Sequence, residues 1–143
     1  MRLLLDTNII LDVLEYREPH YANSAQVLRL CEQRIVTGYI STLTFANIVY
    51  IMRKSLDAVK ILQIYGALNE FLYIVDTTND DVKNAADLKW TDFEDAVQSV
   101  IAERIGATYI VTRNIKDYVD SNVSSISPRE FCEAVLGDVA TNT

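Results

Sequence analysis

The first fourteen residues, MRLLLDTNIILDVL (1–14), place three polar side chains between two very apolar runs. Residues 3–5 are leucines, residues 6–8 are Asp-Thr-Asn, and residues 9–11 are again apolar. A buried carboxylate is costly unless it is paired or hydrogen-bonded, so Asp6 requires an explanation. The pattern predicts a short buried strand over residues 2–6 and a helix over about 8–16. Asp6 then lies at the carboxyl end of the first strand.

Short apolar strands alternate with helices along the rest of the chain. Further strands are predicted near Gly38, over 71–76, over 107–112 and near Ile126, and helices over 20–34, 44–54, 57–70, 78–89, 92–105 and from Pro128 onward. This alternation predicts an α/β fold built from βαβ units, with a parallel sheet and helices on both faces. In such folds ligands bind beyond the carboxyl ends of the strands, which is where Asp6 is expected.

Length and composition predict one domain over residues 1–137, followed by a frayed tail over 138–143. No apolar run approaches the roughly 20 residues of a membrane span, so we expect a cytoplasmic protein without a membrane partner. The net charge of −7 argues against unspecific binding of duplex nucleic acid. Cys31 and Cys132 are expected to be buried free thiols, and the single histidine, His20, argues against imidazole catalysis.

Acidic and amide side chains follow two of the predicted strands. Asp6, Asn114 and Asp117 share one edge of the sheet if their strands are parallel neighbours. On the helix that begins at Asp92, Asp92 and Asp95 lie on the same face, whereas Glu94 lies about 100° or more away and is the poorer candidate. Asp92 and Asp95 also suit a helix cap and its first turn, so a capping role stays open beside a site role.

Asn47 interrupts the very apolar helix predicted over 44–54. A buried amide needs hydrogen-bond partners, so Asn47 either makes a structural hydrogen bond or belongs to a site. Several carboxylates without histidine point to a hard, oxygen-ligated cation such as Mg²⁺ or Mn²⁺. Hydrolysis of a phosphodiester is the reaction that such sites most often serve, with one ion or two about 4 Å apart.

Four segments together resemble the PIN domain, the nuclease fold of VapC-type toxins in toxin–antitoxin pairs. They are LLLDTNIILDVL, STLTFANIVYIMRK, DFEDAVQSVIAERIGATYIVTRN and NIKDY, and their order and spacing match over roughly residues 2–132. The resemblance implies a three-layer α/β/α sandwich with a central, mainly parallel twisted sheet. It also implies a ribonuclease site that depends on Mg²⁺ or Mn²⁺ and is built from acidic residues.

The resemblance assigns roles to individual residues. Asp6 and Asp95 match metal-binding aspartates, Asp92 matches the acid often found before the latter, and Asp117 matches the acid after the fourth strand. The polar residues expected to line the same pocket are Asn8, Asn47, Thr112 and Asn114. Asn47 stands where the family usually has a second acid, a glutamate, which predicts weaker metal binding.

The leading hypothesis is a metal-dependent endoribonuclease, by family analogy the toxin partner of a small antitoxin protein. The basic residues proposed to meet the RNA backbone are Arg53, Lys54, Arg113 and Lys116. Because of Asn47, the alternative is a catalytically weak PIN-like module that binds RNA or a protein. A phosphatase of the haloacid-dehalogenase type is disfavoured, because Asn8 stands where a second aspartate is needed.

A homodimer is expected through the helices at 44–70. The apolar candidates for its interface are Tyr50, Ile51, Ile61, Ile64 and Tyr65, with core packing as the alternative use.

Overall fold

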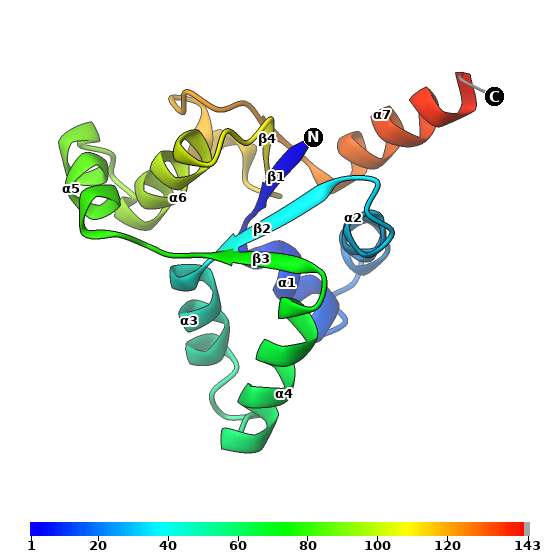
Figure 1. Ribbon diagram of the computed structural model, residues 1–143, viewed down its shortest axis with the longest axis horizontal. Helices are drawn as coiled ribbons and strands as arrows, with labels where there is room; N and C mark the ends of the chain where they lie inside the picture. Colours follow the sequence, from blue (N-terminus) through cyan, green and yellow to red (C-terminus); the bar gives the residue numbers. More distant parts are fainter. Residues whose placement is uncertain (142–143) are drawn as a thin grey trace.

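The computed structural model describes the backbone of residues 1–141 and the side chains of residues 1–137 (Figure 1). Its strands are β1 (Arg2–Leu5), β2 (Thr37–Ser41), β3 (Leu72–Val75), β4 (Tyr109–Val111) and β5 (Ser125–Ile126). Its helices are α1 (Thr7–Leu14), α2 (Tyr21–Glu32), α3 (Thr42–Ile51), α4 (Ala58–Asn69), α5 (Asn79–Leu88), α6 (Phe93–Arg104) and α7 (Pro128–Thr141), with a 3₁₀ helix, η1, at Ile115–Tyr118.

The five strands form one sheet in the order β3-β2-β1-β4-β5, and every neighbouring pair is parallel. The first strand of the chain is therefore the central strand. In its middle, Leu4 lies opposite Tyr39 of β2 and Ile110 of β4. The carboxyl ends of β1, β2 and β4 consequently meet at one edge of the sheet, as the sequence predicts.

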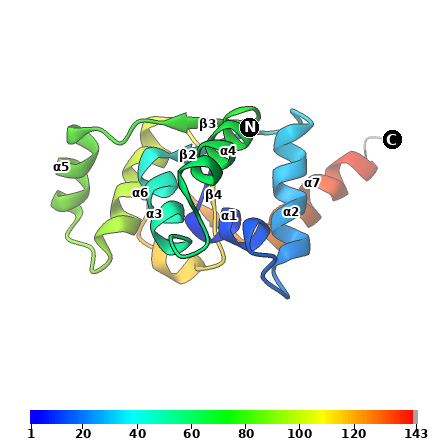
Figure 2. The same ribbon diagram turned by 90° about the horizontal axis from the view of Figure 1, so that it is seen from below.

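Helices cover both faces of the sheet, which confirms the α/β/α sandwich (Figures 1 and 2). The leucines of β1 alternate between the two faces, because successive side chains of a strand point in opposite directions. Leu4 packs with α5 and α6, whereas Leu3 and Leu5 pack with α1, α2 and α7. All three leucines are fully buried, so β1 anchors both layers of the core.

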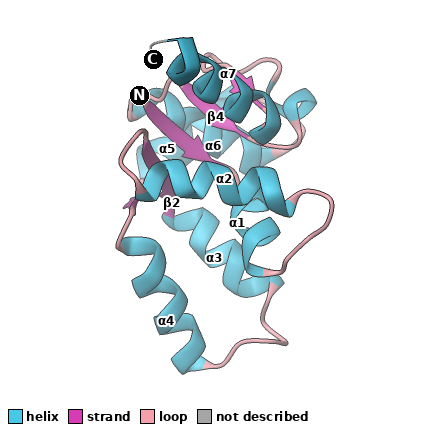
Figure 3. Cartoon of the chain, turned by 90° about the vertical axis from the view of Figure 1, so that its right-hand side faces the viewer, coloured by secondary structure: helices cyan, strands magenta, loops and turns pink. Residues whose placement is uncertain are grey.

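Helix α4 lies at one end of the molecule, beyond α3 (Figure 3). Five residues of α3 and α4 expose large apolar side chains: Tyr50, Ile51, Val59, Leu62 and Tyr65. Ile61 and Ile64, two of the predicted interface residues, are only half-exposed, and Ile64 packs against the core. We call the five exposed residues the α3–α4 apolar face.

The structure places the ends of several elements within a few residues of their predicted positions. Helix α6 begins after its cap, Asp92, and ends before Gly106, whose left-handed φ of 68° suits glycine. Helix α7 continues to Thr141 and so enters the segment predicted to be a frayed tail, while Asn142 and Thr143 lie outside the described residues. Both cysteines are buried and unpaired, as expected. Within residues 1–141, no helix is long and apolar enough to cross a membrane.

Candidate active site

A cleft of about 370 Å³ lies at the carboxyl edge of the sheet. The chain turns there from β1 into α1 and from β4 into η1, and α6 begins beside these turns. We call this cavity the acidic cleft, because five carboxylates line it: Asp6, Asp92, Glu94, Asp95 and Asp117. Thr7, Asn8, Leu11, Arg17, Ile51, Arg113 and Asn114 complete its lining.

Asp6 is the most buried of these acids, with 8% of its surface exposed. It caps α1, and its Oδ1 accepts a hydrogen bond from the Thr7 backbone N–H at 2.8 Å. Its Oδ2 accepts from the hydroxyl of Thr112 at 2.8 Å and from the amide of Asn8 at 3.4 Å. Residues from both β1 and β4 ends thus fix the orientation of this carboxylate.

Asp92 and Asp95 enter the cleft from the start of α6. The Asp92 carboxylate caps the helix by accepting the backbone N–H of Asp95 at 3.1 Å. The phenol of Tyr118, in η1, donates to Oδ1 of Asp95 at 3.0 Å. The sequence leaves open whether Asp92 caps the helix or belongs to a site. In the structure it does both.

Glu94 also lines the cleft, which corrects its dismissal on helical spacing. The spacing argument fails because Asp92 is the cap, with an extended backbone (φ −95°, ψ 105°), so helical geometry does not relate it to Glu94. The amide Nδ2 of Asn47, in α3, donates to Oε1 of Glu94 at 2.5 Å. The sequence offers two roles for Asn47, a structural hydrogen bond or membership of a site. Its hydrogen bond to a carboxylate of the cleft fulfils both.

The two arginines that line the cleft are engaged elsewhere. Arg113 makes a bidentate ion pair with the fully buried Asp12, at 2.8 and 3.0 Å, and Asp12 also accepts from Ser24. Arg17 pairs with Glu15 at 2.6 Å. Within the described chain, none of the five cleft carboxylates forms an ion pair. The cleft therefore carries uncompensated negative charge.

Burial, with repulsion between the carboxylates as a smaller cause, raises the proton affinity of Asp95, Asp6 and Glu94. Burial, followed by the negative charge of Asp92, raises the pKa of Asp95 to about 7. Burial raises the pKa of Asp6 as well, although the hydrogen bonds from Thr112 and Thr7 oppose the shift. Loss of solvation, followed by the charges of Asp6 and Asp92, raises the pKa of Glu94. A nearby cation would lower all three pKa values.

A buried polar network lies beneath the cleft and joins the elements that build it. Gln98 of α6 donates to the hydroxyl of Thr44 in α3, and its carbonyl accepts from Ser41 at 3.0 Å. Thr7 of α1 donates to Thr44 at 3.5 Å. All four residues are buried, so the network holds α1, α3 and α6 in fixed relation.

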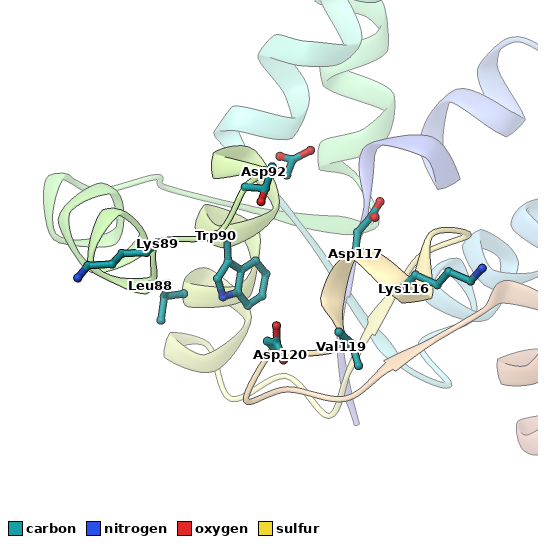
Figure 4. Close-up of a pocket in the computed structure, with 9 residues that line it drawn as sticks. Leu88, Lys89, Trp90, Asp92, Lys116, Asp117, Val119 and Asp120 are labelled. Atoms are coloured by element: carbon teal, nitrogen blue, oxygen red, sulfur yellow. The ribbon is translucent and has the colours of Figure 1, made fainter.

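A second cavity, of about 600 Å³, adjoins the acidic cleft and shares Asp92 and Asp117 with it (Figure 4). Trp90, in the linker between α5 and α6, lies in the middle of its lining (Figure 4). We call it the Trp90 cavity.

The structure brings most of the predicted site residues together. The acidic cleft contains Asp6, Asn8, Asp92, Asp95, Arg113, Asn114 and Asp117. Thr112 and Asn47 reach it through hydrogen bonds to Asp6 and Glu94, and Lys116 lines the Trp90 cavity.

Two predicted residues, Arg53 and Lys54, line neither cavity. Arg53, just beyond α3, is held over the ring of Tyr50 at 4.2 Å, and Lys54 follows it. Sequence reasoning ranked Glu94 as the poorer candidate and missed Asp12, whose signal was an acid in the apolar helix that follows β1.

The donor set suits a hard divalent cation, because carboxylate and amide oxygens line the cleft and no histidine or cysteine does so. Within the described residues, no three acidic, histidine or cysteine side chains converge tightly enough to enclose an ion by themselves.

Comparison with known proteins agrees with this geometry. A family model described as PIN domain matches residues 2–116, most of the chain. The chain belongs to the PIN domain family. This PIN domain is 24% identical over 140 residues to "Ribonuclease VapC1" of Aquifex aeolicus, an alignment that covers 92% of this chain and 94% of the relative.

Solved structures share the fold of this PIN domain at low sequence identity. A chain of a toxin-antitoxin complex from Klebsiella pneumoniae superposes with a TM-score of 0.68 at 22% identity, over 88% of this chain and 97% of that one. A chain of VapBC2 from Rickettsia felis, bound to a DNA fragment from its promoter, gives 0.66 at 20% identity, over 89% and 98%. At these identities the likeness establishes the fold alone.

Proposed function

We propose that this PIN domain is an endoribonuclease that depends on Mg²⁺ or Mn²⁺. The observation that carries the proposal is the acidic cleft itself, where five carboxylates face one cavity without an ion pair in the described chain. Such like-charged groups repel one another, and a divalent cation offsets that cost.

In this proposal Asp6 and Asp95 hold the cation, and Asp92 and Asp117 complete the site. When bound, a divalent ion activates a water molecule for attack on the phosphodiester and stabilises the leaving oxygen. The surrounding residues orient the acids. Thr112, Asn8 and the Thr7 N–H fix Asp6, and the Tyr118 phenol fixes Asp95.

Glu94 supplies the charge that Asn47 lacks. The Asn47 amide holds Oε1 of Glu94, and the other carboxylate oxygen has no partner among the described side chains. Together they place a carboxylate beside α3 although α3 itself carries only an amide. We therefore propose that Glu94 takes the part of the acid that PIN domains usually carry on the third helix.

RNA as the substrate is supported by the relative from Aquifex aeolicus, which is named a ribonuclease. The side chains proposed to meet the RNA backbone are Lys116, at the edge of the neighbouring cavity, and the more distant Arg53 and Lys54. Arg113 is better suited to holding the cleft together, because Asp12 occupies its guanidinium.

A small antitoxin protein is the partner that we propose. Support comes from the similar folds that occur in a toxin-antitoxin complex and in VapBC assemblies. Its contact with this chain would cover the acidic cleft, where a basic side chain of the partner matches the excess of carboxylates.

A catalytically weak RNA- or protein-binding module is the second candidate, and Asn47 is the observation that favours it. Glu94 reduces the force of that observation, because it restores a carboxylate to the cleft. The two candidates differ in one measurable respect: the enzyme cleaves RNA when the metal ion is added, whereas the module binds without cleavage.

A titration with Mn²⁺ and Mg²⁺, read as the thermal unfolding temperature, tests the metal site. A cation that binds only the folded state raises this temperature, and the rise grows with the logarithm of the cation concentration once that exceeds the dissociation constant. We expect a rise for the parent protein and none for Asp6→Asn. Asp92→Asn and Asp57→Asn form a matched pair, because both aspartates cap helices and asparagine preserves a cap. Only Asp92→Asn should weaken the response.

Cleavage of single-stranded RNA tests the activity. Asp6→Asn and Asp95→Asn should each lower the rate by roughly 100-fold or more, whereas Asp57→Asn should leave it unchanged. Equal cleavage by parent, Asp6→Asn and Asp95→Asn would assign the activity to a contaminating nuclease and refute the proposal.

A further inference from the structure

The Trp90 cavity has the size and the position of a substrate subsite. Its volume of about 600 Å³ falls within the roughly 300–1,000 Å³ that small-ligand pockets occupy. It meets the acidic cleft at Asp92 and Asp117, which line both cavities. Whatever fills it therefore lies directly beside the proposed site of phosphodiester hydrolysis.

Its walls combine one aromatic ring with aliphatic side chains. Trp90 is half-buried, and the aliphatic residues Leu88 and Val119 line the cavity with it while staying 42% and 78% exposed (Figure 4). The Trp90 ring packs edge-to-face against Tyr118, with centroids 6.5 Å apart and planes at 74°. The buried Tyr118 thus fixes the indole in place.

We propose that the Trp90 cavity binds a nucleobase of single-stranded RNA that flanks the phosphodiester in the acidic cleft, an inference that rests on the proposed ribonuclease function. Stacking of a base on an aromatic ring is the usual way in which proteins hold unpaired nucleotides. The base is the part of a nucleotide with the flat apolar face that this cavity accommodates.

Charge selects the base rather than the phosphate for the interior of the cavity. Asp120, the carboxylate that lines this cavity but not the acidic cleft, repels a phosphate group, whereas its oxygens accept the N–H donors of a neutral base. Lys89 and Lys116 stand on opposite sides of Trp90 (Figure 4). They are placed to meet the phosphates that lead into and out of the cavity.

The cavity is also connected to the acids that it adjoins. Tyr118 contacts Trp90 through its ring and Asp95 through its hydroxyl, which donates to Oδ1 at 3.0 Å. A base stacked on Trp90 is therefore held at a fixed distance from Asp95. Such positioning sets which phosphodiester of the strand reaches the acids.

The chain contains a single tryptophan, so its fluorescence reports directly on this cavity. The test titrates the full-length protein, with EDTA present to prevent cleavage, with a short single-stranded RNA. We expect saturable quenching of the tryptophan emission. The same oligonucleotide without its bases should bind roughly tenfold more weakly or worse, because it loses the stacking energy.

Binding of a fluorescently labelled RNA, read as anisotropy, compares variants. Trp90→Phe keeps an aromatic face and should retain affinity within about threefold, whereas Trp90→Leu should lose roughly tenfold. Tyr73→Leu is the matched control, since Tyr73 is an exposed aromatic residue on β3 that lines neither cavity. If Trp90→Leu fails to fold, the comparison of the parent protein's affinities for the RNA with and without bases still tests whether the cavity binds a base.

Equal binding of the RNA with and without bases, or no quenching on saturation, overturns the base-binding cavity. Cleavage that Asp6→Asn abolishes would then leave the ribonuclease proposal intact. Conversely, base-dependent quenching without any metal-dependent cleavage supports the cavity and removes the ribonuclease proposal. The failure of either idea is therefore distinguishable from the failure of the other.

Discussion

At the scale of single residues, the contact between Asn47 and Glu94 makes a quantitative prediction. Glu94→Gln turns the pair of one amide and one carboxylate into two amides, so the affinity for Mn²⁺ should fall by roughly 10- to 100-fold. Asn47→Glu combined with Glu94→Gln exchanges the carboxylate and the amide, and should restore much of that affinity. Calorimetric titration of Mn²⁺ without RNA measures both.

Asn122 and Glu103 provide the matched control for this exchange. Their side chains form a similar exposed amide–carboxylate contact, at 3.3 and 3.4 Å, but neither residue lines the acidic cleft. Glu103→Gln should leave the Mn²⁺ affinity unchanged. If Glu94→Gln also left it unchanged, Glu94 would have no part in the metal site.

The raised pKa of Asp95 predicts that the unfolding free energy depends on pH. Its pKa in the folded protein, about 7, lies above the ordinary value of 3.8, so the folded state binds the proton more tightly. The stabilisation is complete below about pH 4 and is lost as the pH rises to 7. In EDTA, the unfolding free energy of the parent should therefore fall between about pH 5 and about pH 8.

Asp95→Asn removes the contribution of Asp95 and so weakens this dependence, because asparagine does not titrate, whereas Asp6 and Glu94, whose pKa values are also raised, still do. Urea unfolding at the two pH values should show the variant to be the more stable protein at about pH 8, although it has lost metal binding. Asp87→Asn, at an exposed position on α5, should keep the parent profile. A variant that is less stable than the parent at about pH 8 contradicts the proposed electrostatic cost.

Individual site residues differed in how readily the sequence revealed them. Asp6 was predictable because a carboxylate directly after a buried parallel strand lies at the carboxyl edge of the sheet, where ligands bind. Glu94 was not, because its position depends on the extended backbone of Asp92 and on an amide 47 residues earlier in the chain. Local periodicity carries no information about either.

At the scale of secondary-structure elements, Gln98 is expected to hold α6 against α3. Gln98→Leu removes its bonds to Thr44 and Ser41 and should lower the unfolding free energy by about 1–3 kcal/mol, as measured by urea denaturation. Gln63→Leu, on the exposed side of α4, should change it by less than about 0.5 kcal/mol. If the two changes lowered the unfolding free energy equally, the hydrogen bonds of Gln98 would contribute nothing specific to stability.

The elements themselves followed from the sequence because strong local signals mark them. Helices α4, α5 and α6 begin where they were expected, and each follows a capping side chain, from Asp57, Thr78 and Asp92 in turn. The strand ends were less predictable: β4 is confined to Tyr109–Val111, because a strand ends where its pairing ends. Helix α7 begins at Pro128 as expected and extends to Thr141, and no end was predicted for it.

At the scale of the whole molecule, we propose that the α3–α4 apolar face joins two copies of the chain. Leu62 and Val59 are 70% and 65% exposed on α4, and Tyr50 is 64% exposed at the end of α3. Sedimentation velocity should find a dimer, and Leu62→Lys should convert it to a monomer by placing a charge in the interface.

Val82→Lys is the control for this change, because Val82 is an exposed apolar residue on α5, outside the α3–α4 apolar face. It should leave the dimer intact. A parent protein that sediments as a monomer at micromolar concentration would refute the dimer. Helical spacing puts Ile61 and Ile64 on the face of the buried Leu68 and Leu62 off that face, which agrees with their burial, but spacing alone does not tell whether Leu62 meets solvent or a partner.

The central place of β1 has a consequence for synthesis of the chain. Strand β1 is synthesised before the other four strands, but its residues Leu3 and Leu5 pair with Tyr109 and Val111 of β4. The Asp6 carboxylate likewise gains its hydrogen bond from Thr112 only when that late residue has been added. The carboxylates of Asp95 and Asp117 are also added late. The cleft therefore does not exist on a partly translated chain. Under the proposed function, the chain could therefore not cleave RNA, its own message included, until nearly all of its domain has been translated.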